Sequence, residues 1–195
     1  MQKGYLMIGA GLSAPRLAAI LLLCAVVHPV LGAQVDDAEA VRLAKPLELI
    51  VPADSRSLQL EKLLEPVDDF YGFWNNGSQV LLSRALSPAF TDHTLPAGRA
   101  QGIAGPAAAS KGFLAAVPDL KVTVLQRLVV ADRVVSHLRF TGHFTGPFRD
   151  VVGKGQTIDF IATDILRVQD GKITDNWHLE DNLTFLTQIG AISKP

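Results

Sequence analysis

The apolar pattern of this chain changes once, near Pro118. Ahead of that proline, apolar residues recur at helical spacing, whereas behind it they alternate with polar residues, as in half-buried strands. We expect the strands at Leu120–Val130, Arg133–Thr145, Thr157–Val168 and Lys172–Glu180. Helices followed by neighbouring strands predict an α+β fold, in which helices cover one face of an antiparallel sheet and leave a natural cavity.

Three helices are expected before the strands and a fourth after them. The first carries an apolar stripe from near Ser57 to Trp74, and Pro66 either kinks it or begins a second helix. Ser78 has the position of an N-cap for a short helix, and Pro106 suits the first turn of another. With 48% hydrophobic residues, the chain can bury a sizeable core.

The N-terminus has the pattern of an export signal. Lys3 and Arg16 precede the apolar run Leu17–Val27, and the small residue Ala33 follows. A basic segment, an apolar segment and small residues, in that order, describe a secretory signal peptide. The apolar run is shorter than the ~20 residues that span a bilayer comfortably. We therefore expect a signal peptide at residues 1–33 and a periplasmic or secreted protein.

The remaining chain is expected to hold one domain, at 57–195, preceded by a linker at 34–56. The linker has two prolines, no sustained period and no aromatic residue, with at most a short helical turn near Ala38–Ala44. Cys24 is the only cysteine, and it lies inside the predicted signal peptide. The mature domain is thus expected to have no disulfide, thiolate nucleophile or cysteine metal site.

Composition and motifs exclude several classes of protein. The formal net charge is −1 and no basic run is present, so a nucleic-acid binder is not expected. No sequence resembles a phosphate-binding loop, a dinucleotide-binding turn or the elbow of a serine hydrolase. No histidine pair has helical metal-ligand spacing. The sequence therefore predicts neither a metal nor a cofactor.

Asp164 is the most informative single residue. It stands in the middle of the otherwise apolar face of the predicted strand Thr157–Val168. A buried charge without a partner costs several kcal/mol, so such a group is paired, hydrogen-bonded or protonated. Asp164 is either a structural acid bonded to a buried N–H group or a pocket carboxylate with a perturbed pKa.

His178, in the next predicted strand, is the second candidate. A two-residue Asp-Gly turn between the strands would set Asp164 opposite Trp177 and turn His178 to the other face. A three-residue turn with a glycine bulge would set Asp164 opposite Asn176, with His178 diagonal on the same face. The apolar pattern favours the first register, and the turn chemistry permits both.

Two other histidines carry weaker signals. His93 follows an aspartate on an expected loop, a setting typical of a surface or capping residue and compatible with a substrate contact. His143 lies between glycines in a predicted strand, which suggests a bulged or closely approached backbone. The large aromatic residues, including Trp74, Phe144 and Trp177, are expected in the core.

From about Phe70 to Lys194 the sequence resembles the SnoaL-like polyketide cyclases, or ester cyclases, of the nuclear-transport-factor-2-like superfamily. The resemblance rests on a series of stretches in the family's order, none specific alone: Phe70–Asn75, Phe90–His93, Gly98–Gly105, Phe113–Leu120, Ala162–Val168, Asp170–Ile173 and Trp177–Leu183. It implies a cone-shaped curved antiparallel sheet wrapped by three to four helices, usually a homodimer through the outer sheet face.

The resemblance also implies a site. In the antibiotic-pathway cyclases the cavity holds an acid/base pair at positions matching Asp164 and His178, with the two residue types exchanged. Both side chains would then share one cavity, which favours the bulged register and places Asn176 on the same face. Relatives commonly carry Gly-Thr-His in the second strand, whereas this chain has Phe144 at the usual histidine position and its own His143 facing the other way.

The implied activity is that of a cofactor-free cyclase, of the lyase or isomerase type, acting on a small apolar carbonyl compound. His178 would remove a proton next to the carbonyl, Asp164 would orient the imidazole or return the proton, and His93 and Asn176 would bond developing oxyanions. The cavity would be lined by Trp74, Phe113, Phe144 and Ala162. The alternative is an exported small-molecule binding protein without catalysis, favoured by the predicted export and by the Phe144 departure.

Overall fold

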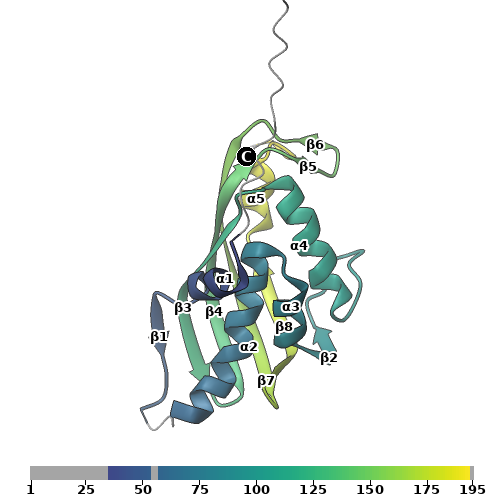
Figure 1. Cartoon of the computed structure of the whole chain (residues 1–195). Helices are drawn as coiled ribbons and strands as arrows, with labels where there is room; N and C mark the ends of the chain where they lie inside the picture. The colour runs from purple at the N-terminus through teal and green to yellow at the C-terminus, as the bar shows by residue number, and fades with distance from the viewer. Residues whose placement is uncertain (1–34, 54–56, 194–195) are drawn as a thin grey trace, which may run out of the picture. The chain divides into compact units, whose positions relative to one another are not determined.

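A computed structural model describes residues 35–53 and 57–193 and shows an α+β fold (Figure 1). The signal peptide expected at 1–33 lies outside the described residues. Four long strands form the predicted antiparallel meander: β3 (Lys121–Val130), β4 (Arg133–Phe144), β7 (Gln156–Gln169) and β8 (Lys172–Glu180). Their order in the sheet follows their order in the chain, as hairpin-connected neighbours require.

The sheet is mixed, which corrects the expectation of a purely antiparallel one. Strand β1 (Glu48–Ile50) pairs parallel to β3 at one edge, and β2 (Leu86–Asp92) pairs parallel to β8 at the other. Both edge strands come from the helical half of the chain, and both are too short or too irregular to give a clear alternating pattern. The full order is β1-β3-β4-β7-β8-β2.

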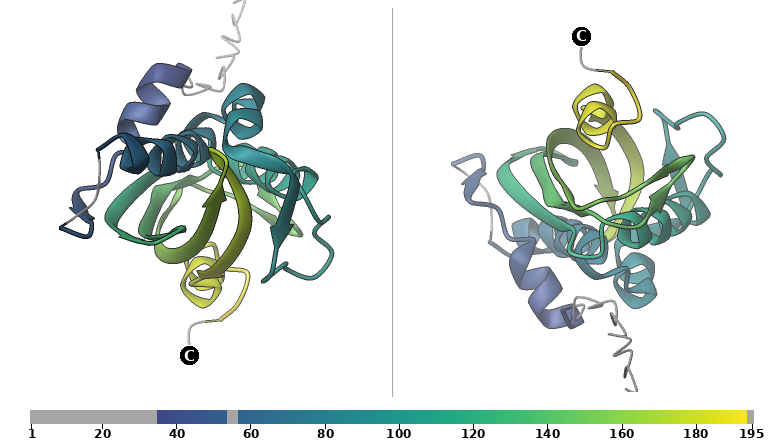
Figure 2. Two further views of the ribbon diagram at one scale, coloured as in Figure 1. Left: turned by 90° about the horizontal axis from the view of Figure 1, so that it is seen from below. Right: turned by 90° about the horizontal axis from the view of Figure 1, so that it is seen from above.

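The helices of the first half lie along one face of the curved sheet (Figure 2). They are α2 (Ser57–Asn76), α3 (Gln79–Ala85) and α4 (Ala104–Ala116), and α5 (Asn182–Gln188) follows the last strand. Pro66 lies inside α2, which continues through it as one helix. Ser78 caps α3 as predicted, because its hydroxyl accepts a hydrogen bond from the N–H of Leu81. No helix in the described part of the chain is long and apolar enough to cross a membrane.

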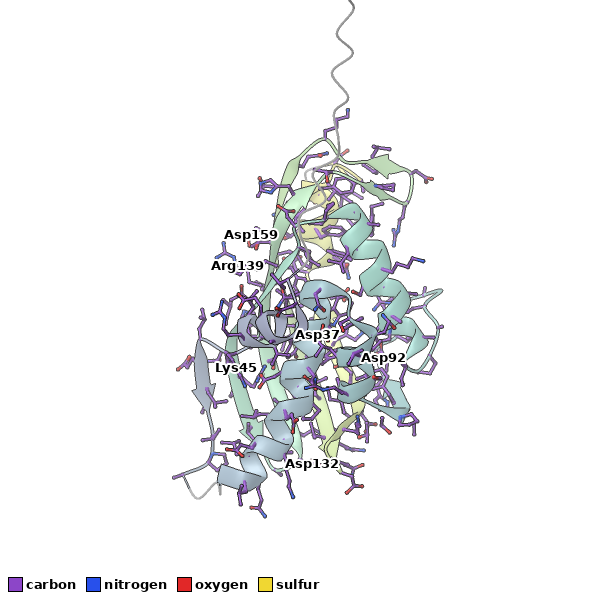
Figure 3. All side chains as sticks on the ribbon, in the orientation of Figure 1. Asp37, Lys45, Asp92, Asp132, Arg139 and Asp159 are labelled. Carbon is purple, nitrogen blue, oxygen red and sulfur yellow. The ribbon has the colours of Figure 1, made fainter. Side chains whose placement is uncertain are left out.

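The segment expected to be a linker carries helix α1 (Asp37–Leu43) and strand β1, and it packs on the domain. Ala40 is fully buried, and the carbonyl of Ala44 accepts a hydrogen bond from the guanidinium of Arg127, which is itself completely buried. The ammonium of Lys45, labelled in Figure 3, donates to Asp68, which also accepts from Arg127. Small alanines make this contact, so the sequence contains neither aromatic residues nor a long apolar stripe that would predict the packing of α1 on the domain.

A small hairpin that sequence reasoning missed closes one end of the core. Its strands are β5 (Pro147–Phe148) and β6 (Val151–Val152), and Arg149 at its turn has a positive φ of 52°. Gly146 lets the hairpin approach α4, because a Cβ at this position would lie only 1.9 Å from the carbonyl oxygen of Ala115. The ring of Phe148 thereby reaches the aromatic cluster beneath the helices.

The β7–β8 hairpin follows neither of the two predicted registers. Its turn is a two-residue Asp-Gly turn with both residues at positive φ, so Gln169 pairs with Lys172. A β-bulge at Thr174 then shifts the register by one residue. As a result Asp164 lies directly opposite His178. The extra residue lets Ile173 join the core before the bulge while the polar residues after it face the same side.

Candidate active site

A cavity of about 560 Å³ opens between the sheet, α4, α5 and the β5–β6 hairpin. Its walls are largely aromatic: Trp74, Phe113, Phe140, Phe148, Phe160 and Phe185. The rings contact one another in a continuous cluster, with Phe140 stacked on Phe160 at 5.0 Å between centroids. The size and apolar lining are those of a small-molecule site, for which ~300–1,000 Å³ is usual.

A smaller polar hollow of about 30 Å³ adjoins the aromatic cavity. The two spaces share four lining residues: Trp74, Arg99, Phe140 and Glu180. The hollow itself is lined by carboxyl, imidazole and amide groups from three strands: Asp92 on β2, Asp164 on β7, and Asn176 and His178 on β8. A molecule in the aromatic cavity would therefore have its inner end at this polar group of residues.

Asp164 is buried and makes one direct hydrogen bond at its carboxylate. The hydroxyl of Tyr71, on α2, donates to Oδ2 of Asp164 over 2.9 Å. Burial raises the pKa of Asp164 to about 6, and the hydrogen bond from Tyr71 and the charge of His178 limit that rise. The carboxyl group can thus gain or lose a proton close to neutral pH, which is the property that acid/base catalysis requires.

His178 is held in place by β2 and the residues that follow it. Its Nε2 lies 3.1 Å from Oδ2 of Asp92, and its backbone N–H donates to the hydroxyl of Thr94 over 2.8 Å. The other carboxylate oxygen of Asp92 accepts the backbone N–H of Thr94. The tautomer with its proton on Nε2 donates to Asp92 and leaves the Nδ1 lone pair free, 3.7 Å from Oε1 of Glu180.

Most of the predicted site residues meet at these two spaces. Trp74 and Phe113 line the aromatic cavity, and Ala162 and Asn176 line the polar hollow next to Asp164 and His178. Asp164 and His178 therefore line one and the same hollow.

His93 and Phe144 are placed elsewhere, contrary to the expectation that they bind substrate. His93 is stacked on Trp177 at 4.3 Å between ring centroids, and its Nε2 lies 2.7 Å from Oδ1 of Asp175. Neither residue lines the cavity or the hollow. Phe144 is completely buried in the core. His143 turns outward, as expected, and pairs with Asp119.

Four residues of the site were missed: Tyr71, Asp92, Arg99 and Glu180. A signal existed for Asp92, because it alternates with the apolar Phe90 along an extended segment and so shares its inward face. Tyr71 reads as part of the apolar stripe of α2. Nothing in the sequence distinguishes Arg99, which lies on a loop, from a solvated surface residue.

Within residues 35–53 and 57–193, no group of three or more His, Cys, Asp or Glu side chains is arranged so that it could hold a metal ion. In the hollow, the imidazole of His178 lies within hydrogen-bonding distance of Asp92, and Asp164 accepts from Tyr71.

Comparisons with solved structures show the same fold. A protein from Bacillus cereus, described as a candidate polyketide cyclase, is 38% identical, with 76% of this chain and 94% of that chain covered and a TM-score of 0.69. A candidate SnoaL-like polyketide cyclase from Jannaschia is 25% identical, covers 74% and 98%, and has a TM-score of 0.59. A protein from Catenulispora acidiphila with a ketosteroid isomerase-like fold, solved with trimethylamine, is 19% identical over 65% and 92%, with a TM-score of 0.51.

A comparison with curated protein sequences gave no match. The sequence profile of the SnoaL-like polyketide cyclases matches residues 66–189, which include the second half of α2, all four long strands and every residue of the polar hollow. The chain therefore belongs to the SnoaL-like polyketide cyclase family.

Proposed function

We propose that the protein is a cofactor-independent cyclase that removes a proton next to a carbonyl group and closes a ring. The observation that carries this proposal is the position of Asp164 directly opposite His178 in the β7–β8 ladder, with both residues lining the polar end of an aromatic cavity. A ring-bearing substrate would occupy the aromatic part, and its reacting carbonyl would meet the imidazole and the carboxyl group at the inner end.

His178 is the proposed base. With Nε2–H donated to Asp92, its Nδ1 can take the proton from the carbon next to the carbonyl, while the C–H electron pair forms the enolate. The imidazolium that results is stabilised by the buried carboxylate of Asp92, which is fixed by its own hydrogen bond from Thr94. This arrangement gives Asp92 the orienting role that sequence analysis had assigned to Asp164.

Asp164 is the proposed partner in proton return. After the enolate carbon attacks a second carbonyl, the new carbon–carbon bond leaves an alkoxide that needs one proton. The imidazolium supplies it, or Asp164 does when it is protonated, so the reaction is balanced without a co-reactant. A carboxyl group with a pKa near 6 exchanges protons readily with an imidazole at neutral pH. Asn176, on the same face, can bond the developing oxyanion.

The test uses α-tetralone, a bicyclic aryl ketone, as a probe of the first step alone. In deuterated water, enzyme-catalysed removal of the α-proton replaces it with deuterium, which NMR follows directly. The wild-type protein is expected to accelerate this exchange. His178→Gln is expected to lose the acceleration by about 10²–10⁴-fold while keeping its melting temperature near that of the wild type.

An exchange rate unchanged by His178→Gln would sink the proposed role of the imidazole. Asp119→Asn is the matched control, because it removes a carboxylate that also pairs with a histidine, His143, but on the exposed side of the sheet. This variant is expected to keep the full exchange rate.

One observation favours a second candidate, an exported protein that binds a small molecule without converting it. The hollow between the acid and base has room for only about one or two water molecules, so a ligand could fill the aromatic cavity and stop short of His178. Native mass spectrometry with α-tetralone separates the two functions. Bound, unexchanged ketone supports simple binding, whereas deuterium in the released ketone supports the cyclase.

A further inference from the structure

Two arginines line the aromatic cavity, at different depths. Arg99, on the loop between β2 and α4, is half-buried and lines both the cavity and the polar hollow. Arg149, at the turn of the β5–β6 hairpin, lines only the aromatic part. Arg149 is exposed at the mouth of the cavity, and apart from the two arginines the polar residues of the lining are Glu180 and Asn182. The two guanidinium groups are therefore the cationic groups that a ligand in this cavity would meet.

Neither guanidinium has an anionic partner within the described part of the chain. No salt bridge or side-chain hydrogen bond joins Arg99 or Arg149 to another described residue. Most other arginines of the domain are paired, for example Arg127 with Asp68. The one acid that lines the aromatic cavity, Glu180, has its carboxylate 3.7 Å from the imidazole of His178. The aromatic cavity therefore has two arginines and one carboxylate in its lining, whereas the adjoining hollow, which Arg99 also lines, adds the carboxyl groups of Asp92 and Asp164.

The setting of Arg149 suits it for holding an anion. Its guanidinium carbon lies 5.4 Å from the centroid of the Phe148 ring, a cation–π contact that positions the group beside the aromatic wall. The edge of a guanidinium over a ring still presents its N–H donors, which match the two oxygens of a carboxylate.

We propose that the ligand of this cavity combines an apolar ring system with an anionic group, a carboxylate or a similar oxyanion, held by Arg149 and Arg99. The inference rests on the proposed function only in placing the substrate in this cavity, and it holds whether or not the ligand is converted. It narrows the substrate from any apolar carbonyl compound to an acidic one.

The experiment compares two fluorescent probes that share a ring body and differ in charge. Anilinonaphthalene sulfonate is an anion, and N-phenylnaphthylamine is its neutral counterpart. Titration of the wild-type protein at fixed ionic strength is expected to give a dissociation constant about tenfold lower for the sulfonate, the gain usual for one charge-assisted hydrogen-bonding contact.

Variants test where the two probes bind and which residues cause the preference for the sulfonate. Gly112→Phe is expected to weaken both probes, because Gly112 lines the cavity and a Cβ there meets no atom within 4 Å, so a ring can be added without a clash. Arg149→Gln and Arg99→Gln are each expected to reduce the preference for the sulfonate to under about threefold.

Arg139→Gln is the matched control for net charge. Arg139 pairs with Asp159, and both are labelled well apart from Asp92 in Figure 3. Arg139 lies between Leu138 and Phe140, which line the hollow, so it points to the other face of the sheet and does not line the cavity. The proposal is overturned if the two probes bind equally, if neither binds, or if Arg139→Gln reduces the preference as much as the cavity variants do. If the wild-type protein does not catalyse deuterium exchange but still prefers the sulfonate, only the proposed cyclase activity is refuted.

Discussion

Strands β2 and β8 carry two histidine–aspartate pairs, one on each face. On the inner face His178 of β8 meets Asp92 of β2, and on the outer face His93, just after β2, meets Asp175 of β8. The chemical groups are the same and the hydrogen-bond lengths are similar. The inner side chains are 8% and 5% exposed, whereas the outer ones are 36% and 14% exposed.

The neighbours of the two pairs decide what each can do. The inner pair lines a hollow that opens on a cavity and faces the buried carboxyl group of Asp164. The outer pair is stacked on Trp177, and the guanidinium carbons of Arg133 and Arg167 lie within 5.7 Å of that ring. A histidine–aspartate pair is therefore a candidate for catalysis only where burial, a second titratable group and space for a substrate coincide.

The largest expected difference between the faces is in activity. His178→Gln should reduce α-proton exchange of α-tetralone by about 10²–10⁴-fold, because it removes the base. His93→Gln, the same substitution on the outer face, should leave the rate within about twofold of the wild type, since a group outside the cavity contributes no catalysis. A comparable loss in both variants would break the distinction between the faces.

The second difference is in the pH dependence of stability, which the inner Asp164 and the outer Asp175 should change in opposite directions. The pKa of Asp164 is raised to about 6, so its contribution to stability is full below pH ~4 and is lost as the pH rises through 6. Relative to Asp164→Asn, the wild type should therefore lose about 3 kcal/mol of unfolding free energy between pH 4 and pH 7. Urea denaturation at several pH values measures this.

The outer carboxyl group should behave in the reverse way. Burial alone would raise the pKa of Asp175, but hydrogen bonds from His93 and Thr174 and the charge of Arg167 outweigh it and hold the pKa below its usual value. Its contribution is present above the ordinary aspartate pKa and disappears as the pH falls through the lowered one. A pH profile of Asp175→Asn parallel to that of Asp164→Asn would contradict the assigned environments.

The third difference concerns the partner of each histidine. Asp92→Asn removes the charge that orients and stabilises the imidazole of His178, and the exchange rate should fall about tenfold. Asp175→Asn makes the same change beside His93 and should leave the rate near that of the wild type. Equal rates for the two variants would show that Asp92 has no positioning role.

The smallest expected effect is on the stability of the outer face. Trp177→Leu loses the stack with His93 and the two cation–π contacts, which should lower the unfolding free energy by about 1 kcal/mol without changing the exchange rate. Trp74→Leu, its counterpart in the cavity wall, should weaken the binding of α-tetralone instead. A fall in exchange rate caused by Trp177→Leu would link the outer face to catalysis.

Much of the fold could be predicted because it depends on patterns that are local. The alternating residues of the four long strands, the Ser78 cap and the stripe of α2 all follow from spacing along the chain. The short helical turn expected near Ala38–Ala44 is α1. Its packing on the domain and the β5–β6 hairpin could not be predicted, since small residues and glycines bring these segments into contact with distant elements. Such contacts produce no repeating apolar pattern in the sequence.

The site could be predicted only in part. Asp164 was identifiable because a carboxyl group on an apolar strand face is costly to bury unless it has a partner or a proton. The face of His178 was not, because a single bulged residue at Thr174 reverses which side chains point inward, and strand patterns do not locate bulges. His93 was expected to contact substrate on the family resemblance, and no residue around it indicates on which face of the sheet it lies.

A double-mutant cycle on Asp164 and His178 tests most directly whether these two residues act as one acid/base unit. The exchange rate of α-tetralone is measured for the wild type, His178→Gln, Asp164→Asn and the double variant. A shared proton relay predicts that the double variant is no slower than the slower single variant, because either change already breaks the relay. Losses that multiply, with each substitution reducing the rate by the same factor whether or not the other is present, would show that the two groups act independently and would contradict the account.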